Sequence, residues 1–322
     1  MAAPTLCARP SEALMADLNE LLEQTSRTCA LAVPLLPEPT TEHVTIAFLL
    51  FRIADTFEDA ERWPVEKRRA ALANFCQLLG SPFLPNVRAL SRRWVDERPS
   101  EHHGYLALLA GAPAVFDALW SLSPRAREII ASYSRRTAEG MAKIVSRSGP
   151  ERLELQSVEE LRTYCYTVAG IVGELLTELF LLDRPRLGGV SGYLRARAVA
   201  FGEGLQLVNI LKDSENDRRA GRRYLPGSAS RIDVMSLARA DLRCAEEYVR
   251  ALQRAGAEGG LVAFTAMPVL LAHASLARIE EAGPDAKVSR AEVAAIYGTL
   301  MERLAARRDP FQDEAASPQP PA

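Results

Sequence analysis

Apolar residues recur along most of the chain at spacings of three and four positions, which is the period of one face of an α-helix. Runs that alternate apolar and polar residues and are rich in β-branched side chains are scarce. The pattern therefore predicts an all-α fold in which short segments rich in Pro and Gly separate the helices. The expected helices cover residues 11–25, 41–58, 64–79, 84–95, 104–110, 112–121, 124–145, 157–180, 190–218, 231–254, 259–281 and 289–307.

One of these helices ends in an acidic motif, "FRIADTFEDAE", directly after the apolar run "TIAFLLF". Successive helical residues differ by about 100° around the axis, so Asp55 and Asp59 lie about 40° apart and can reach one ion. Arg52 lies one turn earlier on nearly the same face. Carboxylates beside an apolar core are costly unless they are paired or bind a metal. The motif is therefore a candidate metal or ion-pair site.

A second helix carries a polar stripe within an apolar sequence. Gln206, Asn209, Asp213 and Asp217 fall within an arc of about 80°, and the residues between them are mostly apolar. A helix on a protein surface shows the opposite pattern, because its apolar stripe is the narrow one. We therefore expect this stripe to line a cavity or an interface.

The two acidic motifs together favour a site for magnesium and a diphosphate. Mg²⁺ prefers hard oxygen ligands and is usually held by one or two carboxylates together with substrate phosphates. Such a site would stabilise a departing diphosphate and leave a carbocation in an apolar cavity. The alternative is a solvated helix with salt bridges between residues three or four apart. A diphosphate would explain the basic neighbours, because guanidinium groups match phosphate oxygens. These neighbours are Arg52, Lys212, Arg218, Arg222 and Arg223.

Composition narrows the class of protein. The formal net charge of −2 does not indicate a nucleic-acid-binding protein, so any polyanion site must be local. The five cysteines are widely spaced and form no CxxC, so neither a disulfide framework nor a zinc site is expected. The first residues lack the charged start and apolar run of a signal peptide. We therefore expect a cytoplasmic protein with at most peripheral membrane contact.

The breaks between the expected helices are too short to be linkers between domains. We therefore expect a flexible N-terminus at 1–10 and one all-α domain at 11–307. The polar, Pro-rich end at 308–322 is expected to be disordered.

With both acidic motifs in hand, the chain resembles the squalene/phytoene synthase family, most closely its bacterial squalene synthases. The resemblance is collinear over roughly residues 20 to 300. It implies a single-domain helical bundle like that of the terpenoid synthases, built around a central apolar cavity. It also implies head-to-head condensation of two prenyl diphosphates through a cyclopropylcarbinyl diphosphate. The motifs are "SRTCALAVPLLP", "FRIADTFED", "YCYTVAGIVGELLTELF" and "GLQLVNILKDSENDRRAGRRYLP", which ends in the family's GR-x-YLP flap.

The resemblance also implies roles for single residues. Tyr164 matches the tyrosine associated with proton removal and cation stabilisation. Lys212 stands where the family more often has Arg, and Glu215 is displaced by one place from the usual D-x-x-E-D. The small residues near Gly173 match cavity-lining positions, although close helix packing would also explain them. The implied metal ligands are Asp55, Glu58, Asp59, Asn209, Asp213 and Asp217. The implied substrate contacts are Ser26, Arg27, Phe48, Arg52, Val168, Ala169, Gly173, Leu176, Gln206, Asn209, Lys212 and Arg222.

The stretches 263–279 and 287–293 are more similar to squalene synthases than to phytoene synthases. The resemblance therefore favours farnesyl diphosphate as substrate and squalene as product, with NADPH as hydride donor. Within the family, the alternatives are a phytoene synthase that uses geranylgeranyl diphosphate and an enzyme that stops at presqualene diphosphate or hydroxysqualene. Outside this reaction, the alternatives are a catalytically silent assembly or binding relative and a cyclising terpene synthase.

Overall fold

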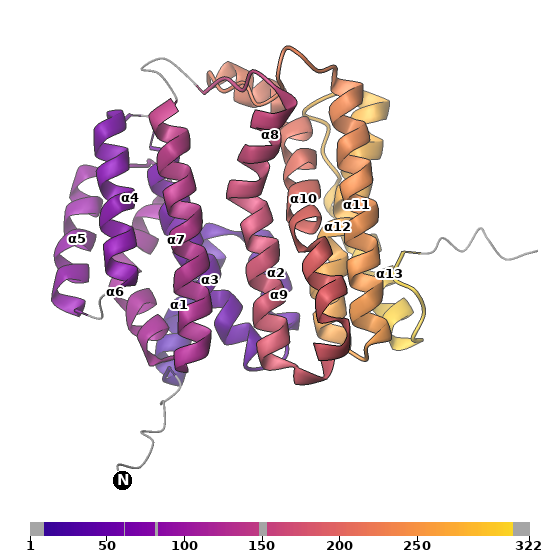
Figure 1. Ribbon diagram of the computed structural model, residues 1–322, viewed down its shortest axis with the longest axis horizontal. Coiled ribbons are helices and arrows are strands. Elements are labelled where there is room, and N and C mark those ends of the chain that lie inside the picture. The colour runs from indigo at the N-terminus through magenta and orange to yellow at the C-terminus, as the bar shows by residue number, and fades with distance from the viewer. Residues whose placement is uncertain (1–9, 61, 81–82, 148–152, 312–322) are drawn as a thin grey trace, which may run out of the picture.

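The structure is a computed structural model that describes residues 10–60, 62–80, 83–147 and 153–311. The long helices run roughly parallel to one another and form one bundle (Figure 1). Within the described residues no β-sheet forms, and a single isolated bridge joins Glu154 to Arg223. The prediction of an all-α fold is confirmed.

The first half of the chain forms seven α-helices in the described residues. These are α1 (Glu12–Thr25), α2 (Arg27–Ala32), α3 (Thr40–Glu58), α4 (Val65–Leu79), α5 (Leu84–Glu97), α6 (His103–Ser121) and α7 (Pro124–Arg147). A 3₁₀ turn, η1 (Val33–Leu35), follows α2. The sequence pattern did not predict α2, because six residues are too few to show a helical period.

The second half begins with one long, interrupted helix. It consists of α8 (Val158–Cys165), the π-helical turn η2 (Tyr166–Gly170) and α9 (Ile171–Asp183). A 3₁₀ turn, η3 (Pro185–Val190), leads into the longest helix, α10 (Ser191–Arg219). The bundle is completed by α11 (Arg231–Arg254), α12 (Gly259–Ala282) and α13 (Arg290–Ala305).

The core is centred on α3, which is apolar on nearly every face and contacts α1, α4, α6, α7 and α9. Its Ile46, Leu49 and Ile53 are fully buried. A helix that is apolar all round is stable only when other elements enclose it. The position of α3 in the bundle thus fixes where its acidic C-terminal end emerges.

The helix α10 packs against α9, η2, α11 and α12. A Cβ atom added at Gly173 would overlap the backbone carbonyl oxygen of Ala198, and one at Gly202 would overlap that of Ala169. These glycines therefore let α10 lie directly against α9 and η2. At Gly173 the structure supports close helix packing rather than the expected role in lining a cavity.

The predicted break near residue 111 is wrong, because α6 continues through Pro113 as one helix. A proline has no N–H, so the carbonyl of Leu109, four residues earlier, loses its helical donor. The hydroxyl of Ser91 on α5 donates to that carbonyl at 2.7 Å. This replacement partner is buried, which explains why the helix tolerates the proline.

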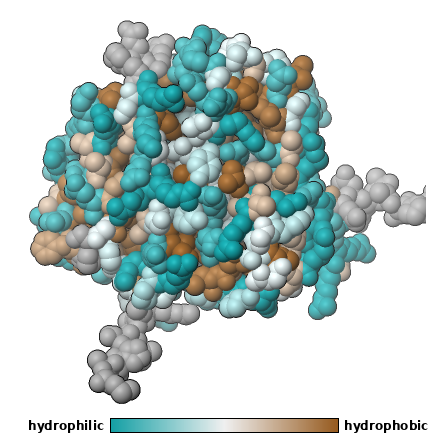
Figure 2. Space-filling view, in the orientation of Figure 1, coloured by the Kyte–Doolittle hydropathy of each residue, from teal (hydrophilic) through white to brown (hydrophobic). Residues whose placement is uncertain are grey.

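By length and composition alone, three helical stretches of the described residues could cross a membrane: His103–Ser121, Val158–Asp183 and Gly259–Ala282. Between 44 and 50% of each apolar window is buried inside the bundle. In Figure 2, hydrophilic side chains cover most of the face shown, and apolar ones form small separate groups.

The expected disordered ends lie partly outside the described residues, since 1–9 and 312–322 are not described. The chain between 308 and 311 is packed against the bundle. Asp309 pairs with Arg250 at 2.8 Å, and the Arg250 guanidinium lies 5.2 Å from the Phe311 ring centroid. The packed part of the chain thus reaches at least Phe311.

Candidate active site

The two acidic motifs meet at the C-terminal ends of α3 and α10. Arg222, in the segment after α10, lies between them. Its Nη1 is 3.7 Å from Oδ1 of Asp59, and its Nη2 is 3.4 Å from Oδ1 of Asp217. One guanidinium group therefore spans the distance between the motifs, so Asp59 and Asp217 belong to a single site.

The other aspartate of the first motif pairs within its own helix. Nη1 of Arg52 is 3.3 Å from Oδ2 of Asp55. The Arg52 guanidinium also lies 5.4 Å from the ring centroid of Phe48 and 5.6 Å from that of Tyr105. Aromatic faces attract a cation and limit its motion. Tyr105, on α6, was not predicted as a site residue, because no motif surrounds it in the sequence.

The surroundings of these acids disfavour their charged forms. Burial raises the pKa of Asp55 to about 6, although the Arg52 guanidinium lowers it, and the charge of Asp59 raises it further. Burial also raises the pKa of Asp217, against the effect of Arg222. Burial raises the pKa of Glu58 well above its usual value. A cation that entered the site would relieve this cost by stabilising the carboxylates.

The polar stripe on α10 is more exposed than most apolar residues of the same helix. Nζ of Lys212 is 3.3 Å from Oδ2 of Asp213 and donates to Oδ1 of Asn209 at 3.2 Å. Gln206, Asp213 and Asp217 are half-buried and Asn209 is exposed. The apolar residues between them, Leu207, Val208, Ile210 and Leu211, are buried.

Two of the neighbouring arginines, Arg218 in the last turn of α10 and Arg223 after it, pair with other acids. Arg218 forms a double hydrogen bond with Glu215 at 3.1 and 2.9 Å, and Nη1 of Arg223 lies 3.4 Å from Oε1 of Glu154. The salt-bridge interpretation is therefore correct for these two. It also accounts for the displaced Glu215, whose carboxylate serves as the partner of Arg218.

Tyr164 lies at the inner side of the site, two residues before the start of the π-turn. Its side chain is buried, and its ring centroid is 4.7 Å from that of Tyr224 with an interplanar angle of 38°. Burial, with the nearby Tyr224 and Glu58, raises the pKa of Tyr164 well above its usual value. Its phenol is therefore neutral at ordinary pH. π-Turns are frequent at functional sites, but the apolar period gave no sign of this one.

The segment that contains Ser26 and Cys29 lies beside Arg52. Burial raises the pKa of the Cys29 thiol above its ordinary value, and the Ser26 hydroxyl and the Arg52 guanidinium offset part of this increase. Ser26 itself caps α2, since its hydroxyl accepts from the backbone N–H of Cys29 at 3.2 Å. The side chain of Arg27, a predicted substrate contact, lies outside the described part of the structure.

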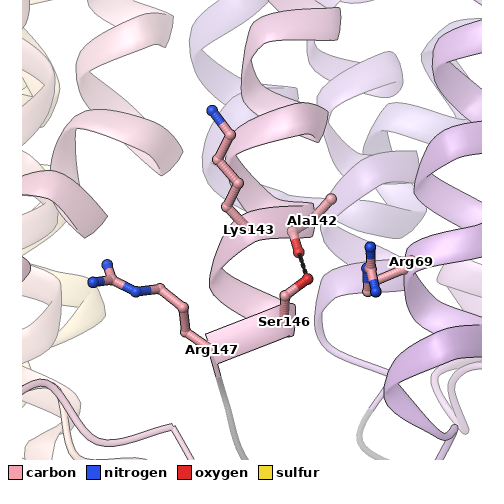
Figure 3. A pocket seen from close by; sticks show the side chains of 5 residues that line it. All are labelled: Arg69, Ala142, Lys143, Ser146 and Arg147. Carbon is pink, nitrogen blue, oxygen red and sulfur yellow. Dashed lines mark hydrogen bonds between the residues drawn. The ribbon is translucent and has the colours of Figure 1, made fainter.

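Of the predicted lining residues, Val168, Ala169 and Leu176 are half-buried on η2 and α9. A surface pocket of about 470 Å³ lies elsewhere, between α4 and α7 (Figure 3). Its wall holds three cations, so it does not match the expected apolar cavity. The pocket is lined by Arg69, Ala142, Lys143, Ser146 and Arg147.

Among the described residues, no group of three or more His, Cys, Asp or Glu side chains is arranged to hold a metal by itself. The donor set is nevertheless suited to magnesium, because each motif offers two hard carboxylates spaced by one helical turn. Mg²⁺ bound in this way needs further oxygen atoms, which a diphosphate would provide.

The part of the chain that matches known sequences contains the residues of this site. The profile of the family described as squalene/phytoene synthase matches residues 22–231. The squalene synthase of Gibberella zeae is 30% identical over 208 residues, which are 64% of this chain and 42% of that protein. The squalene synthase of Homo sapiens is 29% identical over 208 residues, which are 64% of this chain and 45% of that protein. The matched stretch spans less than half the length of these relatives.

The fold is also similar to a solved structure, that of TcSQS with the ligand E5700. The TM-score is 0.72, with 22% identity over 94% of each chain. At this identity the likeness concerns the fold alone, and it extends beyond the region that the family profile matches.

Proposed function

Because the chain belongs to the squalene/phytoene synthase family, we propose that it condenses two farnesyl diphosphates head to head, through presqualene diphosphate, to squalene. The observation that carries the proposal is the position of Arg222 between Asp59 and Asp217. It brings the two acidic motifs of the sequence into one site, which supports the proposal that they hold a metal-bound diphosphate together.

The carboxylates proposed to hold magnesium are Asp55 and Asp59 on one side and Asp213 and Asp217 on the other. When bound, Mg²⁺ would neutralise the diphosphate and so make it a better leaving group. Glu58 is buried and its pKa is raised, so we propose a place for it behind this layer rather than a direct contact.

The basic residues have a complementary role. Arg52 and Lys212 lie beside the acids of their own helices, while Arg222 reaches both motifs. We propose that these side chains donate hydrogen bonds to diphosphate oxygens when substrate binds. For Arg222 this means exchanging carboxylate partners for phosphate partners, which keeps its charge compensated throughout.

Tyr164 is proposed to act as a neutral phenol. Its raised pKa means that no phenolate is available in advance to remove a proton. Its ring face and hydroxyl oxygen can still stabilise a nearby carbocation, because both carry negative charge density. A proton that it accepted in the reaction would have to move on to a neighbouring acceptor.

Squalene is favoured as product by the sequence of 263–279 and 287–293, and it requires a hydride that NADPH would supply. The named curated relatives are squalene synthases. Phytoene synthesis from geranylgeranyl diphosphate and release of presqualene diphosphate or hydroxysqualene are the alternatives. A silent binding relative is disfavoured by the presence of all four aspartates.

The proposal is tested by incubating the purified protein with Mg²⁺ and either farnesyl or geranylgeranyl diphosphate, with and without NADPH. Mass spectrometry of the products is the measurement. We expect squalene from farnesyl diphosphate only when NADPH is present, and a stalled diphosphate or an alcohol without it. Phytoene would reassign the substrate, and the absence of diphosphate release from either substrate would overturn the proposed function.

A further inference from the structure

The segment that follows α10 crosses the top of the bundle near α8 and is held there by its backbone (Figure 1). We call residues 221–226 the flap. It starts at Gly221, whose φ of +87° is readily available only to glycine. The N–H of Arg223 donates to the carbonyl of Leu153 at 2.8 Å, and the N–H of Leu155 donates to the carbonyl of Arg223 at 2.9 Å. These two bonds fix the middle of the flap.

These two hydrogen bonds form the bridge between Glu154 and Arg223, and they determine which flap side chains face the site. Successive side chains of an extended segment point to opposite sides. Arg223 points outward, where it is exposed and pairs with Glu154. Arg222 and Tyr224 therefore point inward, and both have inward contacts. A shift of one residue in the pairing would exchange these two sets of side chains.

The two inward side chains have different partners. Arg222 contacts the carboxylates of Asp59 and Asp217. Tyr224 is only 8% exposed and packs against Tyr164, with the ring centroids 4.7 Å apart. The two phenols are also close enough for each to affect the pKa of the other. The flap thus places a cation on the acids and a phenol on the residue proposed to stabilise the carbocation.

We propose that Tyr224 is a positioning residue for Tyr164. From the flap, it holds the Tyr164 ring and hydroxyl in one orientation and thereby decides how the carbocation is stabilised and quenched. This inference rests on the proposed function. It adds a specific role for the flap tyrosine. The backbone bridge that places Arg222 against the acids also places Tyr224 against Tyr164.

Two variants separate the hydroxyl from the ring. Tyr224→Phe keeps the ring contact and removes the hydroxyl, whereas Tyr224→Leu removes both. Tyr193→Phe is the matched control, because Tyr193 is an exposed tyrosine whose hydroxyl bonds to Glu247 at 3.2 Å on α11. Melting followed by circular dichroism identifies any variant that has lost its fold. The conservative change Tyr224→Phe is the less disruptive of the two.

The measurements are kcat and KM for pyrophosphate release from farnesyl diphosphate, together with the product distribution. We expect Tyr224→Phe to lower kcat about tenfold with KM changed less than about twofold. Tyr224→Leu should lower kcat further and divert product to water-quenched alcohols. The control should match the wild type.

Each other outcome counts against the proposal. If the wild type turns over and the folded Tyr224→Phe and Tyr224→Leu variants retain its kcat and products, the positioning role is overturned while the proposed function stands. A loss that appears only in KM would assign Tyr224 to substrate binding and overturn the positioning role. An inert wild type would overturn the proposed function, and this inference with it.

Discussion

At the scale of single residues, the site shows which of several similar side chains takes part. Four arginines follow Asp217 within the next six residues, and of these Arg222 reaches both motifs. The pair of Arg218 with Glu215 could be predicted from their spacing of three, because such pairs depend on the local helix alone. The contacts of Arg222 could not, because they depend on how distant helices pack.

Removing the charge of Asp55 should stabilise the metal-free protein. Its pKa is about 6 in the folded chain and its ordinary value is 3.8. A raised acid pKa means that folding favours the protonated form, so the cost of ionisation grows between pH 3.8 and 6 and is complete above that range. Asp55→Asn should therefore raise stability at pH 8 by about 1–2 kcal/mol, after allowance for solvent screening and the lost pair with Arg52.

The measurement is the melting temperature in Mg²⁺-free buffer at pH 8 and at pH 4, where the difference should vanish. Asp96→Asn is the control, since Asp96 is exposed on α5. If Asp55→Asn melted at a lower temperature than the wild type at pH 8, ionised Asp55 would not destabilise the fold.

Neighbouring flap arginines should differ in their effect on catalysis. Arg222→Gln removes the cation that spans the acids, so we expect kcat/KM to fall about 100-fold and the Mg²⁺ requirement to rise. Arg223→Gln removes an exposed pair with Glu154 and should stay within about twofold of the wild type. Steady-state kinetics across a Mg²⁺ titration distinguishes the two. Equal losses in both variants would mean that general surface charge, rather than the Arg222 contact, supports the reaction.

At the scale of helices, the apolar period located nearly every long element, because each long helix buries one face or all of itself. The apolar period gave the wrong result where the backbone departs from regular α-helical geometry although the sequence pattern stays the same. The π-turn at Tyr166–Gly170 lies within a continuous apolar run. The helix passes through the break expected at residue 111, and Ser91, on another helix, donates to the Leu109 carbonyl that Pro113 leaves without a helical donor. Both features depend on tertiary contacts that spacing does not encode.

The helix contact at Gly173 allows a direct test of packing against cavity lining. A methyl group there would meet the Ala198 carbonyl oxygen on α10, so Gly173→Ala should destabilise the fold by about 2–4 kcal/mol. Gly192→Ala, in the first turn of α10 where an added Cβ would have no neighbour within 4 Å, should be neutral or slightly stabilising. Urea unfolding gives both values. If Gly173→Ala kept full stability and changed only the product, the residue would belong to the cavity wall.

At the scale of the whole molecule, the sequence motifs identified the family, and the family profile confirms it. The sequence alone could not show that the ends of α3 and α10 converge, since the polar stripe predicts a lined space without naming what faces it. The packing of the bundle supplies that information, because α3 and α10 both contact α9 and both end beneath the flap.

We propose that the two acidic motifs work as one magnesium–diphosphate site. The most direct test of this proposal is the rate of pyrophosphate release from farnesyl diphosphate across a Mg²⁺ titration, measured for the wild type, Asp55→Asn and Asp217→Asn. We predict saturable dependence on Mg²⁺ in the wild type and a loss of at least about 100-fold in each variant, although the two residues lie on different helices. Release without divalent ions, or wild-type rates in either variant, would contradict the claim.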